Sequence, residues 1–373
     1  MSDVFAGTAP ERAVPDARAT HEIGYVGIGD DLGQERRWLD GWGLAHAVTV
    51  QNVDLDGGDR GLLAEQLSGF DALVVEGIEV DRPLLERLPG LRIVALQSIG
   101  TDSVDLDAAA ELAVAVSNAP GFCTEEVAAH TVALILDVVR QVSFYDREVR
   151  AGGWEPLPGG RGLPLRPSGL TVGLVYFGSI PQRVVPVLAA LGMSVGVFAP
   201  SKSAADLAGW GVRRFDTLEE LLRESDVVSL HAPLIPATRH LIGAAELAVM
   251  KPGAYLVNTA RGGLVDEVAL VDALESGVIA GAALDVIDDE SSGSTCLRRL
   301  PQVVMTPHTG YLSEESALSA RRMALESVVD VLVHGRSPRF AAHPREAGGA
   351  GDAGGAGEAG GAADVPGAPG RRA

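Results

Sequence analysis

Cysteine is scarce in this sequence: the 373 residues contain two, Cys123 and Cys296, which lie far apart and belong to no CxxC pair. Two isolated thiols cannot form the disulfide framework of a small secreted domain, and they cannot supply the ligands of a structural zinc site. We therefore expect no bound metal and a reducing compartment, which we interpret as the cytoplasm.

Long apolar runs are also missing, although hydrophobic residues make up 46% of the chain. No stretch reaches the ~18 apolar residues that a membrane-spanning helix needs. Residues Met1 to Thr20 mix acidic and basic side chains and contain no apolar segment of the kind found in secretory signals. The sequence therefore predicts no membrane partner.

Basic residues are outnumbered: 30 Lys and Arg stand against 50 Asp and Glu, which gives a formal net charge of −20. Such a charge repels nucleic acid unless a basic patch is concentrated locally, and the pair Arg213-Arg214 is too short to form one. We expect no nucleic-acid partner. An acidic substrate would need a specific cation inside a cleft.

Large side chains nearly disappear at the C-terminal end, where the Gly/Ala-rich tract from about Ala347 onward has no large apolar residue except Val365. A segment of this composition cannot bury enough surface to offset the entropy that it loses on ordering. We expect a disordered tail over 341–373 and, from a similar but less extreme composition, a disordered N-terminus over 1–20.

Between these ends, short apolar runs alternate with helix-forming segments, as in parallel sheets that are covered by helices. The first set, within about 21–118, is HEIGYVGI, AHAVTVQ, DALVVEG, RIVALQ and VAVSN. The second set starts at residue 170 and is LTVGLVYF, SVGVFA, DVVSLH, AYLVN, IAGAALDV and VVMT. This double alternation predicts an α/β protein with two doubly wound, Rossmann-like parallel-sheet domains and a cleft between them.

Two helices have clear sequence signals. Thr124 is expected to cap a helix whose first turn contains Glu125 and Glu126, where acidic side chains are favourable. A helical pattern from Glu314 to Val333 closes the ordered part of the chain, and we expect it to return to the first domain.

Three residues with useful chemistry follow strands of the second set: Arg261 after the run that ends at Asn258, Glu290 after GAALDV, and His308 after VVMT. Each has an ordinary interpretation, namely a surface arginine, a solvated acidic turn and a structural histidine. Because the carboxyl ends of parallel strands meet at one edge of a sheet, we expect the three side chains to converge.

Together the three side chains would be complementary. Histidine exchanges a proton near neutral pH, and a neighbouring carboxylate fixes its tautomer and favours its charged form. The planar fork of arginine binds a carboxylate through two hydrogen bonds. The set is therefore suited to a small-molecule carboxylate substrate.

These residues lie in longer motifs: LHAPL (230–234), TRHLI (238–242), VNTARGGLVDE (257–267), GAALDV (281–286) and MTPHTGYLSEES (305–316). With them the chain, from about Ile93 to Pro338, resembles the D-isomer-specific 2-hydroxyacid dehydrogenases, most of all the phosphoglycerate dehydrogenase and C-terminal-binding-protein branches. The resemblance implies a dehydrogenase that uses NAD or NADP and has Arg261, Glu290 and His308 as its catalytic residues. Ser291 stands where the family usually has proline.

The resemblance also covers LQSIGTDSVDLDAAA (96–110). It implies that the backbone N–H groups of Ser98, Ile99 and Gly100 bind the substrate carboxylate together with Arg261. It further implies a substrate domain of 21–118 plus 309–340, a dinucleotide-binding domain of 119–308, and a homodimer formed through 124–160, which includes Trp154.

The glycine-rich loop at VGLVYFGSIPQRVV (172–185) departs from the family pattern. Only Gly178 remains of the three fingerprint glycines, because Tyr176 and Pro181 replace the others. Those glycines permit a tight turn, a close approach to the pyrophosphate and close helix–strand packing. Pro186 falls inside the next helix, which we expect to start late or to kink.

A second departure is Ala199, which replaces the acid that would hold the adenosine ribose hydroxyls. Its loss can favour NADP, and Lys202 is near enough in sequence to bind a 2′-phosphate, unless it is an ordinary surface lysine. The resemblance assigns the cofactor to Tyr176, Gly178, Ser179, Ile180, Ala199, Pro233, Thr259 and Asp285.

Two hypotheses follow. In the first, the protein is an oxidoreductase that transfers hydride between a nicotinamide cofactor and C2 of a 2-hydroxy or 2-oxo acid. In the second, a relative with lost or altered cofactor use acts as a ligand-binding or regulatory subunit, or as a non-redox enzyme that uses the same Arg/Glu/His site. The second hypothesis rests on Tyr176, Pro181, Pro186 and Ala199. A corepressor role of the C-terminal-binding-protein type is a more distant alternative.

Overall fold

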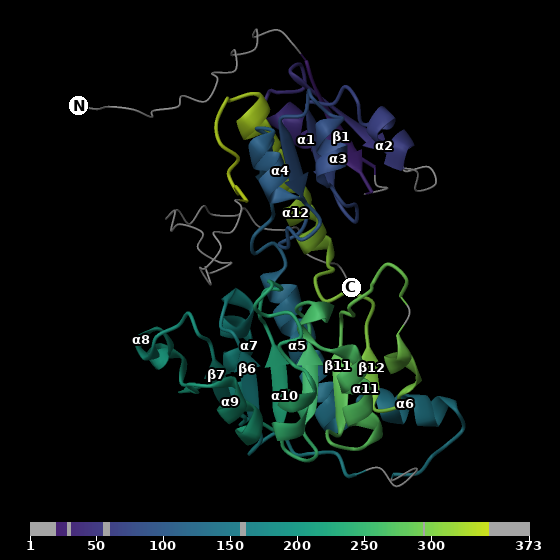
Figure 1. Ribbon diagram of the computed structural model, residues 1–373, viewed down its shortest axis with the longest axis vertical. Coiled ribbons are helices and arrows are strands. Elements are labelled where there is room, and N and C mark those ends of the chain that lie inside the picture. Colours follow the sequence, from purple (N-terminus) through teal and green to yellow (C-terminus); the bar gives the residue numbers. More distant parts are fainter. Residues whose placement is uncertain (1–19, 28–30, 55–59, 157–161, 294, 343–373) are drawn as a thin grey trace, which may run out of the picture.

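The computed structural model describes residues 20–27, 31–54, 60–156, 162–293 and 295–342, which form two lobes stacked along the long axis of the molecule (Figure 1). The segments predicted to be disordered, 1–20 and 341–373, lie outside these residues except for residues 20, 341 and 342.

The first lobe is built on five parallel strands in the order β2-β1-β3-β4-β5. Four of them lie within the apolar runs from which the sequence predicts strands, and β2 overlaps its run, AHAVTVQ, and ends two residues beyond it. The strands are β1 (His21–Val26), β2 (Val48–Val53), β3 (Ala72–Val75), β4 (Ile93–Leu96) and β5 (Ala115–Ser117), and the helices between them are α1 (Gly33–Gly41), α2 (Arg60–Gln66), α3 (Arg82–Glu86) and α4 (Leu106–Glu111).

Both faces of this sheet are buried, because alternate strand side chains point to opposite sides. Leu73 and Val75 of β3 belong to one apolar cluster, whereas Ala72 and Val74 belong to another. The second cluster is completed by side chains of α12 (Glu314–Leu332), which contacts β3, β4 and β5. The last helix of the described chain therefore covers the first sheet (Figure 1).

The second lobe contains seven parallel strands in the order β12-β11-β10-β9-β6-β7-β8. The strand order reverses between β6 and β9, and the crevice outside such a reversal is where open α/β sheets bind ligands. The strands are β6 (Thr171–Val175), β7 (Ser194–Phe198), β8 (Arg213–Arg214), β9 (Val227–Leu230), β10 (Tyr255–Asn258), β11 (Gly281–Leu284) and β12 (Val303–Met305).

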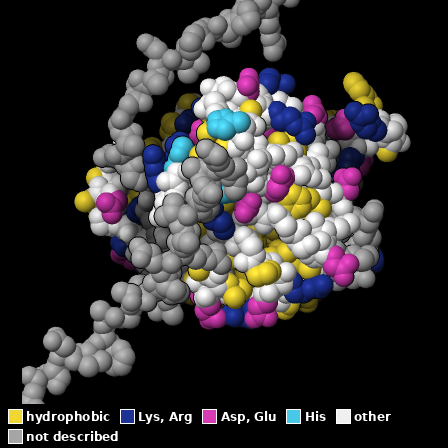
Figure 2. All heavy atoms as spheres, turned by 90° about the horizontal axis from the view of Figure 1, so that it is seen from above, with side chains coloured by type: hydrophobic (Ala, Val, Ile, Leu, Met, Phe, Trp, Pro, Cys, Tyr) yellow, Lys and Arg dark blue, Asp and Glu magenta, His cyan; other side chains and the backbone are white. Residues whose placement is uncertain are grey.

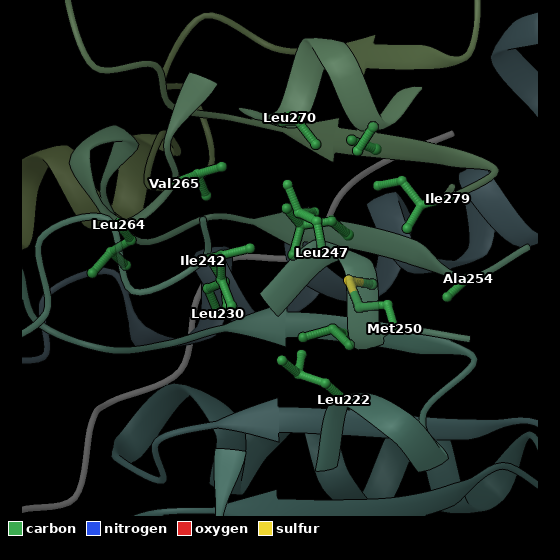
Figure 3. Packing of buried hydrophobic residues seen from close by; sticks show 14 of the residues in the cluster. Leu222, Leu230, Ile242, Leu247, Met250, Ala254, Leu264, Val265, Leu270 and Ile279 are labelled. Atoms are coloured by element: carbon green, nitrogen blue, oxygen red, sulfur yellow. The ribbon is translucent and has the colours of Figure 1, made fainter. Parts of the chain in front are cut away.

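Helices cover both faces of the second sheet. Figure 3 shows one face, where Leu222, Leu247 and Leu270 from three different helices pack in one apolar cluster. The other face is covered by α5 and α7, which contact each other. The helices of this lobe are α5 (Thr124–Arg140), α6 (Val142–Arg150), α7 (Ser179–Ala190), α8 (Ala204–Leu207), α9 (Leu218–Glu224), α10 (Ala244–Val249) and α11 (Glu267–Glu275), with short 3-10 turns η2 (Ala208–Trp210), η3 (Gly262–Leu264) and η4 (Cys296–Arg299).

The predicted fold class, an α/β protein with two doubly wound parallel sheets, is confirmed. The expected role of Thr124 is wrong, because Thr124 is the first residue of α5 and Cys123 occupies the capping position without a side-chain hydrogen bond. The Thr124 hydroxyl donates instead to the Gly121 carbonyl at 3.2 Å.

The helix α7 does not start late, since it begins at Ser179, directly after Gly178, and extends through Pro186. Pro186 is exposed, so the hydrogen bond that it removes lies on the solvent side, where water can satisfy the freed carbonyl. The short edge strand β8 was missed because two exposed arginines carry no apolar pattern.

The end of the molecule formed by the first lobe carries acidic and basic side chains interspersed with small apolar groups (Figure 2). Among the described residues, no group of three or more His, Cys, Asp or Glu side chains is arranged to hold a metal ion. None of the described helices is by itself long and apolar enough to cross a membrane, although α5 and α6 together, with a bend of 64° between them, meet the length and composition criteria.

Candidate active site

The most direct contact between two predicted site residues joins His308 and Glu290, whose Nδ1 and Oε2 atoms lie 2.7 Å apart. Both side chains are partly exposed, at 40% and 42%. His308 has a left-handed backbone conformation, with φ of 52°, that non-glycine residues adopt infrequently. Because Glu290 occupies Nδ1, the Nε2 atom is the one left to exchange a proton with a ligand.

Asp285 organises the loop that carries His308. Its carboxylate accepts hydrogen bonds from the Thr306 hydroxyl at 2.5 Å and from the N–H groups of Thr309 and Gly310, both at 2.9 Å. A Cβ atom at position 310 would lie 2.8 Å from an Asp285 oxygen, so this approach needs glycine. The Asp285 backbone carbonyl also accepts from the His308 N–H group at 2.8 Å.

The ionisation of Asp285 reflects these contacts. Burial by itself would raise the pKa of the carboxyl, but hydrogen bonds from His130, Thr306 and the loop backbone outweigh burial and lower the pKa to about 2. His130 comes from α5, and its Nε2 atom lies 3.0 Å from the Thr306 hydroxyl. Asp285 is therefore an ionised anchor between α5 and the His308 loop.

Glu290 lies on a loop after β11 that is held at both ends by Glu267 of α11. The two Glu267 carboxylate oxygens accept from the Asp288 N–H group at 2.8 Å and the Thr295 hydroxyl at 2.9 Å. Ser291, at the usual proline position, donates its hydroxyl to Asp289 at 2.6 Å. This hydrogen bond restrains the turn beside Glu290 where a proline ring would otherwise do so.

Arg261 follows β10 and lies against the first lobe. Its Nε atom is 3.2 Å from Asp102, and a Cβ atom at Gly100 would lie 2.1 Å from its Nη2 atom. Gly262 has an equally close neighbour, because a Cβ there would lie 1.9 Å from the carbonyl carbon of Ile287. The two glycines thus let the arginine lie close to the 98–102 loop and to the chain leading to Glu290.

The 98–100 loop, which is predicted to bind a substrate carboxylate, is held in place by hydrogen bonds to its backbone carbonyls. The Ser98 carbonyl accepts from the Ala119 N–H group at 2.9 Å, and the Asn118 side chain donates to the Ile99 carbonyl at 2.8 Å. Within the described residues, the N–H groups of Ser98, Ile99 and Gly100 donate to no backbone carbonyl. These donors, next to the Arg261 guanidinium, suit a carboxylate ligand.

Arg261 makes no hydrogen bond or ion pair to Glu290 or His308 within the described residues, but Cys123 interacts electrostatically with Arg261 and with Tyr311, the ring next to His308. Burial raises the pKa of the Cys123 thiol to about 12, the Glu126 charge raises it further, and the Arg261 guanidinium lowers it.

Tyr311 lies edge-on to His308, with ring centroids 5.8 Å apart. Burial raises the pKa of Tyr311, and the negative charge of Glu76 raises it further.

The residues assigned to a cofactor all follow carboxyl ends of strands in the second sheet, from β6 to β11. Gly178 has no atom within 4 Å of where its Cβ would be, and α7 begins at the next residue. A helix N-terminus with an open glycine face is suited to a phosphate, because the first N–H groups have no partner within the helix. The donors Ser179 and Ile180 therefore fit the pyrophosphate of a dinucleotide.

Two replaced glycines have different structural consequences. Pro181 is the third residue of α7 and is buried, so its missing N–H group removes no hydrogen bond within the helix. Tyr176 has φ of 73°, a left-handed conformation that a bulky side chain rarely adopts, and its partly buried side chain packs against the apolar cluster that includes Leu230 and Leu264. The turn therefore keeps a glycine-like backbone without a glycine.

Other assigned cofactor residues are engaged within the protein. Ala199 is 2% exposed and packs in the core, and its carbonyl accepts from the Lys202 N–H group at 3.0 Å. The Thr259 hydroxyl lies 2.8 Å from that of Thr131, and the Pro233 carbonyl accepts from the Thr238 hydroxyl at 2.6 Å.

Sequence reasoning missed several residues that shape this site: Glu76, Asp102, His130 and Tyr311. Glu76 directly follows a buried strand, which is the same signal that identified Arg261 and Asp285. Asp102 and Tyr311 lie inside the quoted motifs. His130 carries no local signal, because a single polar residue on a largely buried helix is common.

The chain is similar to known proteins in sequence and in fold. The family model described as "D-isomer specific 2-hydroxyacid dehydrogenase, NAD binding domain" matches residues 132–310. A glyoxylate reductase of Thermococcus litoralis is 37% identical over 279 residues, which are 72% of this chain and 83% of that protein. A D-3-phosphoglycerate dehydrogenase of Methanocaldococcus jannaschii is 36% identical over 271 residues, but the match spans only 51% of its length.

Among solved structures, the TT0316 protein of Thermus thermophilus is similar to this chain with a TM-score of 0.74 and 36% sequence identity. The match covers 86% of this chain and 99% of that structure. The likeness therefore includes both lobes.

Proposed function

The chain belongs to the D-isomer-specific 2-hydroxyacid dehydrogenase family, and from that premise we propose that His308, Glu290 and Arg261 carry out its chemistry. The protein is an oxidoreductase that transfers hydride between a nicotinamide cofactor and a 2-hydroxy or 2-oxo acid. A nicotinamide cofactor, held by residues of the second lobe, would supply or accept the hydride at C2 of the acid. The observation that carries the assignment of roles is the 2.7 Å contact between His308 and Glu290.

His308 donates a proton to the substrate oxygen during reduction and accepts it during oxidation. Glu290 holds the imidazole through Nδ1 and stabilises its protonated form. Arg261 and the N–H groups of Ser98, Ile99 and Gly100 hold the substrate carboxylate, so that C2 is presented in one orientation. Asp285 keeps His308 in its left-handed loop conformation.

We propose a corresponding division of the chain. Residues 21–118 and 309–340 supply the substrate side, because α12 packs on the first sheet. Residues 119–308 supply the dinucleotide side, where Gly178, Ser179 and Ile180 hold the pyrophosphate. Arg261 and His308 stand at the boundary between the two parts.

For the nucleotide, we propose that NADPH is accepted as well as NADH. Position 199 has no carboxylate to repel a 2′-phosphate, and Lys202 belongs to the same turn. Lys202→Gln should then weaken NADPH binding by about tenfold and leave NADH binding unchanged, as expected for the loss of one charged phosphate contact. Equal effects on both nucleotides would contradict this assignment.

We also propose a homodimer formed through 124–160, of which 157–160 lie outside the described residues. Within the described part, Val142 and Val149 of α6 are 61% and 47% exposed, and Trp154 is 85% exposed. Several exposed large apolar side chains within one segment favour a protein partner. Light scattering should report a dimer, and Val149→Glu should weaken it. A wild-type monomer at micromolar concentration would contradict the proposal.

One observation favours the second hypothesis, in which cofactor use is lost or altered: the bulky Tyr176 in a turn where the family has glycine. The test is titration with NADH and NADPH, followed by nicotinamide fluorescence, and then turnover with glyoxylate, pyruvate and hydroxypyruvate. We expect binding and turnover with at least one acid. Binding of neither nucleotide at millimolar concentration would support the alternative and refute the assigned chemistry.

A further inference from the structure

Tyr311 connects the catalytic histidine to the first lobe. Its ring lies edge-on to His308, and its hydroxyl donates to an oxygen of Glu76 at 3.4 Å. Burial and then the charge of Glu76 raise the pKa of Tyr311, so the phenol keeps its proton and remains a donor. Glu76 is therefore linked to the reaction site through a single side chain.

Glu76 also lies beside the loop that is suited to a substrate carboxylate. It directly follows β3, whose last residue, Val75, pairs with Leu96 at the end of β4. The Ser98–Gly100 segment begins two residues after Leu96. Since neighbouring parallel strands end at the same edge, Glu76 and this segment border the same region.

The acidic side chains around the site follow one pattern, because each of them is paired with a polar group of the site. Each of the three polar groups of the site has an acidic partner: Arg261 has Asp102, His308 has Glu290, and Tyr311 has Glu76. The single charge of Arg261 is thus shared between Asp102 and the carboxylate of the substrate. A second anionic group on the substrate, near Tyr311, would meet the carboxylate of Glu76.

We propose that Glu76, presented beside Tyr311, makes this enzyme selective for 2-oxo and 2-hydroxy acids that carry a single negative charge. Acids with a distal phosphate or second carboxylate are disfavoured by repulsion from Glu76. This inference rests on the proposed function and names the substrate class of the same site. The expected substrates therefore differ from that of the relatives named D-3-phosphoglycerate dehydrogenase, whose named substrate carries a phosphate.

The test compares hydroxypyruvate with 3-phosphohydroxypyruvate, two substrates that differ only in the distal phosphate. The wild-type protein should have kcat/KM at least about tenfold lower for the phosphorylated acid, as expected for a like charge close to the bound group. Glu76→Gln should reduce this difference severalfold, mainly through KM, because the amide oxygen still accepts from Tyr311 but carries no charge. The difference should also shrink with added salt, which screens exposed charges.

Glu79→Gln is the matched control, since Glu79 is exposed in the same segment and the substitution changes the net charge equally. It should leave the ratio unchanged. Equal use of both acids by the wild-type protein, or an unchanged ratio in a folded Glu76→Gln variant, would overturn the inference. If Glu76→Gln fails to fold, the wild-type ratio and its salt dependence decide. If no 2-oxo acid is turned over, the proposed function fails, and calorimetric affinities of the two acids still decide whether charge selects the ligand.

Discussion

His308 and Glu290 are paired at 2.7 Å although 18 positions separate them and they follow different strands. The pairing depends on two anchors elsewhere, since Asp285 fixes the loop of His308 and Glu267 fixes the loop of Glu290. Neither anchor needs to touch a substrate. Substitutions at these supporting residues should therefore affect the site, as substitutions of the reacting groups do.

Replacing His308 with Asn should lower kcat by about 10²- to 10⁴-fold, because the proton transfer is lost. Asparagine is the preferred substitution because it tolerates a positive φ, so the loop conformation is retained. NADH affinity, measured by fluorescence, should stay the same. Unchanged turnover would reject the role of His308, and loss of nucleotide binding would indicate a structural role instead.

The substitution Glu290→Gln should lower kcat by about tenfold or more with little change in KM, since an amide can hold the imidazole but cannot stabilise its charge. Steady-state kinetics separate the effect on kcat from the effect on KM. Glu275→Gln, an exposed position at the end of α11, is the control. An equal effect of the two substitutions would show that Glu290 acts only through net charge.

Substitutions of Tyr176 test whether the altered turn limits cofactor binding. Both Tyr176→Gly and Tyr176→Ala remove the ring, but only glycine also relieves the left-handed backbone at φ of 73°. The glycine variant should therefore be more stable to unfolding than the alanine variant by about 1 kcal/mol. It should also bind NADH more tightly than the wild type. Weaker binding would show that the ring supports the nucleotide.

Asp285→Asn should destabilise the fold by about 2 kcal/mol at neutral pH, because a buried, charge-assisted set of hydrogen bonds is weakened. The sign of the pH effect follows from the lowered pKa. The folded carboxyl has a pKa of about 2 against an ordinary 3.8, so its contribution is complete above 3.8 and is lost as the pH falls towards 2. Denaturant unfolding from pH 6 to pH 2 should show the stability gap between wild type and variant closing in that window. A gap that stays constant with pH would contradict the assignment.

The fold could be predicted well from the sequence, because its signals are local. The strands other than β8 coincide with apolar runs of the sequence, several of them buried along their whole length, as coverage of both sheet faces requires. The same signal places Arg261, Glu290 and His308 after strands, and the structure brings His308 and Glu290 together, while the roles of the three residues stay predictions. The predicted cap at Thr124 and the late start of α7 failed because caps and helix starts depend on backbone geometry that one residue type does not fix.

The sequence alone determined the strands other than β8 and the sheet that each of them joins, the helix from Thr124 and the last helix over the first sheet, and which polar residues follow the strands. Only the tertiary structure decided the side-chain contacts between distant segments, such as Arg261 with Asp102 and Tyr311 with Glu76. The physical reason is that hydrophobic periodicity specifies which face of an element is buried, whereas contacts between distant segments depend on how complete sheets and helices pack against one another.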